Sequence, residues 1–431
     1  MSARMAAVAV LAALLVGLLA GLLALAPGRE QSVPARAVPA DASLDFTADQ
    51  IATGDELSSR VRVPSLISLA VSLAVVLALG LTGAGAALVQ AAARPLGGGW
   101  VWQVLLGGLV VLGLVRLATL PFAAWAETIR RDAGLSTRSW GSWAVDVLKG
   151  FGINTAILLV ALLALVALAR AMPRWWWVPA AFGAAVLVVV VSFLYPLVVE
   201  PVFNRFESMP EGPLRTSLLE LAEQDGVPVD DVLVADASRR TSTLNAYVSG
   251  FGASRRIVVY DTLVDQAPAD EVRLVVAHEL GHAADNDVLK GTLVGALGAA
   301  AAMVALFLVL GWQPLLQRAG VSGMGDGRVV ALVVALVTVT SLLTAPVQSW
   351  ASRRVEARAD QHALDLTRDP VTFTQMQRRL ALTAKADVTP NPVLFWWFGS
   401  HPSAPQRLAA ARSWALDNDV PEPPPLAADA P

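Results

Sequence analysis

The stretch VVAHELGHAADND, residues 275–287, places His278 and His282 four positions apart, with Glu279 directly after the first histidine. Four residues advance an α-helix by about 400°, so both imidazoles project from one face and can reach the same metal ion. Glu279 lies one step around the helix, where its carboxylate can act on a metal-bound water without being a ligand. His-Glu-x-x-His metalloproteases work in this way, with zinc lowering the pKa of the water. The bare pattern is short enough to occur by chance, so its surroundings must decide.

The composition around this stretch is that of a membrane protein. The chain has 431 residues, of which 55% are hydrophobic and 16% are charged, whereas soluble domains carry about 25% charged residues. The net charge of -3 gives no indication of a nucleic-acid partner. The absence of cysteine excludes disulfides, cysteine zinc sites and cysteine nucleophiles.

Several apolar segments are long enough, or nearly so, to cross a bilayer as helices, which takes about 20 residues. They are residues 5–26, 64–91, 101–125, 151–171, 177–198, 290–311 and 328–348. One such segment could be a buried helix of a soluble core, but all of them together predict a polytopic α-helical membrane protein. The first ends in Ala24-Leu25-Ala26 and is either a retained helix or a cleaved signal peptide; its weakly charged N-terminal flank favours the retained helix. Arg116, inside the third segment, is expected to extend its side chain to the nearer membrane surface.

Two polar regions alternate with these spans, and the expected organisation follows from them. It comprises residues 1–26 (first span), 27–198 (N-terminal membrane region with spans two to five), 199–289 (catalytic region with the histidine pair), 290–348 (transmembrane hairpin), 349–415 (second catalytic region) and 416–431 (proline-rich disordered tail). Two spans separate the polar regions, so both emerge on the same face of the membrane.

Basic residues favour a cytoplasmic position for this catalytic face, in a multi-pass protein of the cell membrane. The catalytic face carries Arg29, Arg36, Arg60, Arg62, Arg130, Arg131, Arg138 and Lys149, and the opposite face carries Arg4, Arg94, Arg170, Arg174, Arg318 and Arg328. Cleavage of the first segment would turn the catalytic face outward.

Zinc needs a third protein ligand. A metzincin would place a histidine six residues after His282, but Val288 stands there. His362 and His401 remain possible ligands, as do later acidic residues. The best candidate is Glu356, in SWASRRVEARADQHALD (349–365).

Asp360 follows Glu356 by four residues and therefore shares its helical face. It could hydrogen-bond a metal ligand or the substrate. The alternative is a solvated helix face on which both acids form ordinary ion pairs with neighbouring arginines.

Ordered blocks along most of the chain resemble the type I CAAX prenyl proteases, which are integral-membrane zinc metallopeptidases of the gluzincin kind. The blocks are PLVVEPVFNRFESMPEGPLR (196–215), VLVADASRRTSTLNAYVSGFGASRRIVVYDTLV (232–264), HELGH (278–282), SRRVEARAD (352–360) and HPSAPQR (401–407), preceded by LPF (120–122) and GLST (134–137). The resemblance implies one zinc ion per chain, held by His278, His282 and Glu356, with Glu279 as general base and Asp360 as a catalytic helper. It also implies transmembrane helices, about seven here, that enclose a water-filled chamber.

Substrate-binding residues are expected around a small β-hairpin or sheet. The segments TLNAYVSG (243–250) and RRIVVYDTLV (255–264) are typical of strands. In the family, the Asn-Ala-Tyr strand pairs with an extended peptide, so Asn245 and Ala246 are expected to bind substrate. The alternative is a hairpin that only packs beneath the metal-binding helix. His401 and Arg407 could polarise a carbonyl group or hold a carboxylate, or could simply begin a helix at the surface.

The sequence therefore predicts a membrane-embedded zinc metalloendopeptidase. Its expected partners are peptide or protein substrates, with lipid-modified C-termini as one class, and membrane lipids. Two alternatives stay open, a general quality-control protease for membrane proteins and a non-catalytic membrane scaffold with the same fold.

Overall fold

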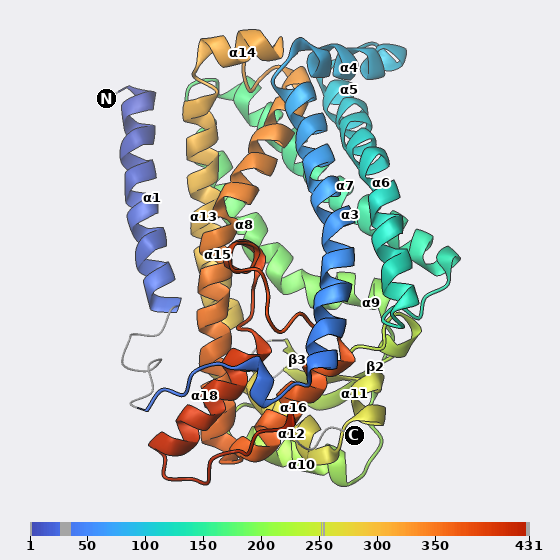
Figure 1. Ribbon diagram of the computed structural model, residues 1–431. Coiled ribbons are helices and arrows are strands. Elements are labelled where there is room, and N and C mark those ends of the chain that lie inside the picture. The colour runs from blue at the N-terminus through green and yellow to red at the C-terminus, as the bar shows by residue number, and fades with distance from the viewer. Residues whose placement is uncertain (1, 26–35, 251, 253–254, 428–431) are drawn as a thin grey trace.

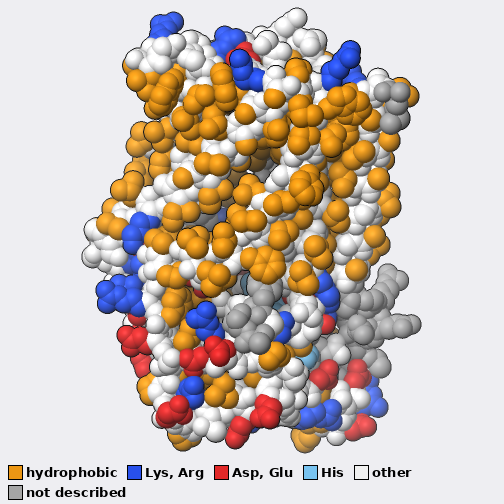
Figure 2. All heavy atoms as spheres, turned by 180° about the vertical axis from the view of Figure 1, so that it is seen from behind, with side chains coloured by type: hydrophobic (Ala, Val, Ile, Leu, Met, Phe, Trp, Pro, Cys, Tyr) orange, Lys and Arg blue, Asp and Glu red, His pale blue; other side chains and the backbone are white. Residues whose placement is uncertain are grey.

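The computed structural model describes residues 2–25, 36–250, 252 and 255–427 (Figure 1). Within these ranges, 7 helices are long and apolar enough to cross a membrane. They are α1 (Ala3–Leu25), α3 (Ala48–Gly80), α6 (Gly108–Asp132, continuous with α5, Trp100–Trp102), α7 (Trp140–Ala171), α8 (Trp177–Leu194, continuing toward α9, Glu200–Phe203), α13 (Asp287–Val309) and α15 (Val330–Thr367). The predicted polytopic helical fold is confirmed. Figure 2 shows hydrophobic side chains in a broad band over these helices, with basic side chains at both ends and most acidic side chains at the lower end.

The second predicted span differs from the structure, because residues 64–91 form parts of two helices. Helix α3 ends at Gly80, and α4 (Gly83–Ala93) starts after a turn in which the Thr82 side chain accepts a hydrogen bond from the amide of Ala84. A Cβ on Gly80 would lie 2.4 Å from the Cβ of Ala335, so the turn packs tightly against α15. Hydropathy is continuous across this turn and therefore cannot reveal it.

A small α/β domain lies below the membrane helices in Figure 1. Its helices are α10 (Pro213–Gln224), α11 (Asp261–Gln266), α12 (Ala269–Ala284), α16 (Pro370–Thr383) and α18 (Ala404–Asp417). Its strands are β1 (Phe206–Ser208), β2 (Asp231–Ala235), β3 (Ala246–Ser249) and β4 (Arg256–Tyr260). Helix α17 (Pro392–Phe398) lies against the membrane part of α15, where the indole of Trp397 donates to the carbonyl oxygen of Leu342. The short α14 (Gln313–Ala319) lies at the other end of the molecule.

The strands form one mixed sheet in the order β1-β2-β4-β3, in which β2 and β4 are parallel and the other two pairings are antiparallel. Strand β3 is therefore at an edge and keeps one side free to pair with another chain. Helix α12 belongs to the same core as this sheet, and Ile257, Val259, Val276 and Leu280 are all 0% exposed.

Helix α15 joins the membrane region to the small α/β domain without a break. It runs from Val330 to Thr367, so the expected boundary between residues 348 and 349 falls inside it. The last membrane helix therefore carries its own C-terminal turns directly into the α/β domain.

The C-terminal segment differs from the expected disordered tail over the residues that the structure describes. Arg412 is 3% exposed and donates to the carbonyl oxygens of Pro423 and Pro424, while Leu426 is 7% exposed. The same guanidinium forms a buried ion pair with Asp45. A buried arginine needs these acceptors, and they hold the segment against α18. Residues 428–431 lie outside the described part.

Candidate active site

The two histidines of HELGH project from one face of α12 toward each other. Their Nε2 atoms are 3.3 Å apart and their rings are nearly perpendicular. Glu356 approaches from α15, with Oε2 3.3 Å from the Nε2 of His278 and Oε1 3.8 Å from the Nε2 of His282. Three ligand-type side chains from two helices thus converge on one point.

These donors fit a single metal ion. Two ligand atoms that each lie about 2.0–2.1 Å from a tetrahedral ion are roughly 3.3 Å apart, as the two Nε2 atoms are. Oε2 of Glu356 is buried and has no hydrogen-bond donor among the described residues. An anionic oxygen in that position needs a positive partner, and a metal ion between the three side chains would supply it.

Carboxylates behind the two rings fix their orientation. The Nδ1 atom of His278 lies 2.9 Å from Oδ1 of Asp360, and the Nδ1 atom of His282 lies 3.0 Å from Oδ2 of Asp287. A carboxylate at Nδ1 turns the opposite nitrogen, Nε2, toward the metal site and increases its basicity. Burial alone would lower the pKa of His278, but the neighbouring carboxylates of Asp360 and Glu356 raise it to about 9, so a proton and a metal compete for this ring.

Sequence reasoning missed Asp287. It is brought under His282 by Asn286, which has a φ of 54° and stands between the end of α12 at Ala284 and the start of α13 at Asp287. The available signal was the segment HAADND itself, because an asparagine between two acids favours a left-handed turn. The role of the acid after that turn depends on the angle between two helices, which the sequence does not contain.

Glu279 lies beside the three converging side chains, in a cavity of about 320 Å³. The cavity is lined by eight of the nine residues singled out from the sequence: Asn245, Ala246, His278, Glu279, His282, Glu356, His401 and Arg407. The ninth, Asp360, lies behind the ring of His278. Burial raises the pKa of the Glu279 carboxyl, which makes it a stronger proton acceptor; the charge of a bound metal would act in the opposite direction.

The edge strand β3 forms one wall of this cavity. Asn245 precedes the strand, has an exposed side chain and accepts a backbone hydrogen bond from Tyr260 of β4 at 3.0 Å. Ala246 is 2% exposed and packs inward. The hairpin therefore packs against the metal-binding helix and also presents an edge to the cavity, so the two interpretations of the sequence are compatible.

Arg407 and His401 occupy different positions in the cavity. Arg407 forms an ion pair with Asp360, and its Nη2 lies 3.4 Å from the Nδ1 of His278. His401 has a side chain that is 59% exposed, and its Nε2 lies 3.4 Å from Oε1 of Glu356. Arg407 thus belongs to the buried support of the site, whereas His401 is on its open side.

His362 lies away from the converging donors and packs between helices, so it is not one of them. Its Nε2 is 2.8 Å from Oδ1 of Asp225. Its ring packs over Gly281, where a Cβ would lie only 3.0–3.2 Å from the imidazole side chain. Glycine in HELGH therefore allows α12 and α15 to approach closely enough for Glu356 to meet the histidines.

Two family models match adjoining parts of the chain. The model "CAAX prenyl protease N-terminal, five membrane helices" matches residues 34–205, and the model "Peptidase family M48" matches residues 208–415, which include both helices of the site. The chain belongs to the CAAX prenyl protease family. It is therefore a multi-pass membrane metallopeptidase that acts on peptides or proteins, and the scaffold alternative is not favoured.

Individual relatives agree with this assignment. The chain is 29% identical to the uncharacterized metalloprotease YhfN of Bacillus subtilis over 314 residues, 71% of this chain and 72% of YhfN. It is 30% identical to CAAX prenyl protease 1 of Saccharomyces cerevisiae over 189 residues, which are 42% of each chain. It shares its fold with the crystal structure of S. mikatae Ste24p, with a TM-score of 0.65 at 23% identity over 76% of this chain and 80% of that chain.

Proposed function

We propose that the protein is a zinc endopeptidase that binds one zinc ion through His278, His282 and Glu356. The proposal is supported above all by the mutual distances of 3.3, 3.3 and 3.8 Å among the Nε2 atoms and the Glu356 carboxylate. Nitrogen and carboxylate donors in this number are typical of catalytic zinc sites, which keep a further position open for water or substrate.

Each polar residue then has a task that its position permits. A bound zinc ion supplies a Lewis acid and lowers the pKa of water in the site. Glu279 accepts the proton of the attacking water and returns it to the leaving amine. Asp360 and Asp287 hold the two imidazoles in orientation through their Nδ1 atoms. His401, on the open side of the cavity, donates to the substrate carbonyl as negative charge develops on its oxygen.

The substrate lies along β3 in an extended conformation. The edge strand offers unpaired backbone groups, and a peptide that adds to it in the cavity brings its scissile bond to Glu279. Asn245 contacts the peptide through its exposed amide, and Ala246 supplies backbone pairing because its side chain is buried. Arg407 supports this arrangement through Asp360 and does not need to touch the substrate.

We further propose that the substrates have C-termini of the CAAX type carrying a lipid, and that the catalytic face is cytoplasmic in the cell membrane. The names of the eukaryotic relatives support the substrate class, and the distribution of arginine and lysine supports the orientation. General cleavage of membrane-associated peptides is the competing activity for the same site.

Matched peptides test the chemistry and the substrate class together. Detergent-purified protein is incubated with a farnesylated CAAX peptide and with the same peptide without lipid, with Glu279→Gln and a chelator as controls. Faster cleavage of the farnesylated peptide, lost in Glu279→Gln although zinc remains bound, is the expected result. Equal and chelator-sensitive cleavage of both peptides would support the zinc chemistry and contradict the proposed class of lipid-modified substrates. Cleavage that survives in Glu279→Gln would contradict the proposed base.

A further inference from the structure

A second, larger cavity of about 880 Å³ lies among the membrane helices. Helices α3, α6, α7 and α15 contribute most of its lining, and its apolar wall is made by Val76, Leu112, Val115, Leu158, Leu162, Val333 and Val334. The volume is within the range of roughly 300–1,000 Å³ that is usual for small-molecule sites. Its charged lining consists of three arginines and one aspartate, Arg116, Arg138, Arg240 and Asp146, so the cavity favours an anion.

Arg116 is at the middle of its transmembrane helix. It is 16 residues from Trp100 and 16 from Asp132, the two ends of that span, which corresponds to about 24 Å in each direction. The expected extension of its side chain to the membrane surface stays a prediction, and Arg116 lines the cavity.

Arg116 has no protein partner in the part of the chain that the structure describes. Its Nε atom is buried without a hydrogen-bond acceptor, and no hydrogen bond or ion pair joins its guanidinium to another described residue. A charge in the hydrocarbon region is costly unless it is paired, and such residues are commonly functional. The unpaired guanidinium therefore points to an anionic ligand.

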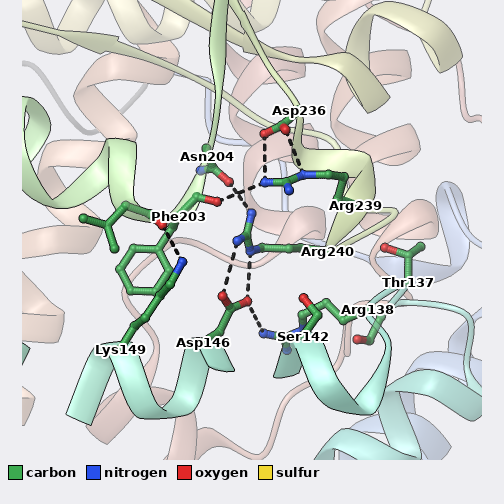
Figure 3. Close-up of polar contacts among 12 residues, drawn as sticks. Thr137, Arg138, Ser142, Asp146, Lys149, Phe203, Asn204, Asp236, Arg239 and Arg240 are labelled. Atoms are coloured by element: carbon green, nitrogen blue, oxygen red, sulfur yellow. Dashed lines mark hydrogen bonds and ion pairs between the residues drawn. The ribbon is translucent and has the colours of Figure 1, made fainter. Parts of the chain in front are cut away.

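The other two arginines of the lining, Arg138 and Arg240, already form ion pairs with acidic side chains, and Figure 3 shows those with Asp146. Arg240 donates to both carboxylate oxygens of Asp146, at 3.0 and 3.3 Å, and to Asn204 at 3.1 Å. Arg138 donates to Glu127 at 2.9 Å and lies 3.8 Å from Asp146. Asp146 and Glu127 largely neutralise the charges of Arg138 and Arg240, which leaves Arg116 as the binding centre for an anion.

We propose that this cavity binds a single-chain anionic amphiphile, whose carboxylate or phosphate group pairs with Arg116 and whose hydrocarbon chain lies against the apolar wall. The planar fork of a guanidinium matches either head group. The surrounding leucines and valines suit an alkyl or isoprenoid chain and disfavour a hydrophilic anion. The assignment depends on the cavity and its charges and does not require the proposed peptidase chemistry.

The amphiphile would lie beside the substrate strand. Tyr260 of β4 lines the membrane cavity, Tyr247 of β3 lines the metal-site cavity, and their ring centroids are 6.5 Å apart. The β3–β4 hairpin is therefore a wall shared by both cavities. An occupant of the larger cavity contacts the back of the hairpin on whose edge the peptide is proposed to bind.

Binding of palmitate to the purified, full-length protein in a neutral detergent tests this proposal, with hexadecanol as the uncharged analogue. Radiolabelled palmitate is titrated against wild type, Arg116→Gln, Arg116→Lys, Arg318→Gln and Val337→Trp. Arg318→Gln is the matched control, because it removes one exposed cation on α14, outside the cavity. Val337 lines the cavity and is 45% exposed, so tryptophan there reduces the volume and keeps the charge. Palmityl phosphate and phosphatidylglycerol serve as competitors.

Wild type and Arg318→Gln are expected to bind palmitate more tightly than hexadecanol. Arg116→Gln should lose about 10- to 100-fold in palmitate affinity, the value of a hydrogen bond to a charged group, with hexadecanol unchanged. Arg116→Lys should keep a preference for the anion, and Val337→Trp should weaken both ligands. Palmityl phosphate should compete with palmitate and phosphatidylglycerol should not, and equal competition by the two-chain phosphatidylglycerol would overturn the single-chain assignment. Equal binding of palmitate and hexadecanol by wild type, or unchanged palmitate binding in Arg116→Gln, would overturn the proposal.

Discussion

The Asp360–Arg407 pair allows structural support and metal binding to be separated by mutation. Both side chains are buried, at 4% and 13% exposure. Removing one partner of a buried ion pair leaves the other charge unpaired and costs about 3–5 kcal/mol, whereas replacing both by apolar residues of similar volume is often neutral. The informative set is therefore Asp360→Leu, Arg407→Met and the double variant.

Metal affinity should follow a different order from stability. Asp360 also holds the Nδ1 atom of His278 at 2.9 Å, and losing such an orienting partner weakens metal binding by about 10- to 100-fold. Asp360→Leu and the double variant should both show this loss. Arg407→Met keeps the carboxylate beside His278 and should bind metal nearly as well as wild type.

The two quantities are measured separately. Thermal unfolding of the metal-free protein in detergent reports stability without the contribution of bound metal. Competition with a fluorescent zinc chelator reports affinity. The expected result is that the double variant recovers most of the unfolding midpoint lost in Asp360→Leu and none of the metal affinity. Full recovery of metal affinity in the double variant would refute the orienting role and leave Asp360 as a counter-ion for Arg407.

Three further predictions concern the approach of the helices, the support of the second histidine and the orientation. Gly281→Ala should lower the free energy of unfolding by about 1–3 kcal/mol and weaken metal binding, because the added Cβ would lie 3.0 Å from the side chain of His362 and push α12 away from α15. Gly291→Ala is the control in the same assays, because a Cβ there meets nothing within 4 Å. Asp287→Ala should lower metal affinity by about 10- to 100-fold, and Asp285→Ala should not, as chelator competition would show. A cysteine introduced at the exposed Pro425 should react with an impermeant maleimide only after the cells are opened. Labelling of intact cells would show that the catalytic face is outside the cell and contradict the proposed orientation.

The membrane architecture could be predicted from the sequence because crossing a bilayer requires length and apolar composition, and both are visible locally. The turn between α3 and α4 could not, since it depends on Gly80 and Gly85, which pack against Ala335 and Ala331 of α15, far along the chain. The strand predicted over 255–264 ends at Tyr260, where α11 begins with Asp261. Hydropathy and strand propensity do not register such contacts.

The candidate site, like the fold, could be predicted only in part from the sequence. The helical spacing of His278 and His282 was sufficient to bring their nitrogens together, because four residues make about one turn. Glu356 had competing interpretations, since an acid among arginines is usually a surface residue; the structure instead buries it with an oxygen lacking a donor. Its role as a ligand stays a prediction, as do those of Glu279, Asn245 and His401.

The position of Glu356 explains why a transmembrane hairpin interrupts the catalytic residues. Helix α12 is followed within three residues by α13, which crosses the membrane, and α15 returns with Glu356 and Asp360 on its C-terminal turns. The distance between the ligand helices is therefore fixed by packing inside the bilayer as well as by Gly281. A change that shifts α15 relative to α13 in the membrane moves Glu356 relative to the two histidines, so metal affinity is expected to report how the membrane helices pack.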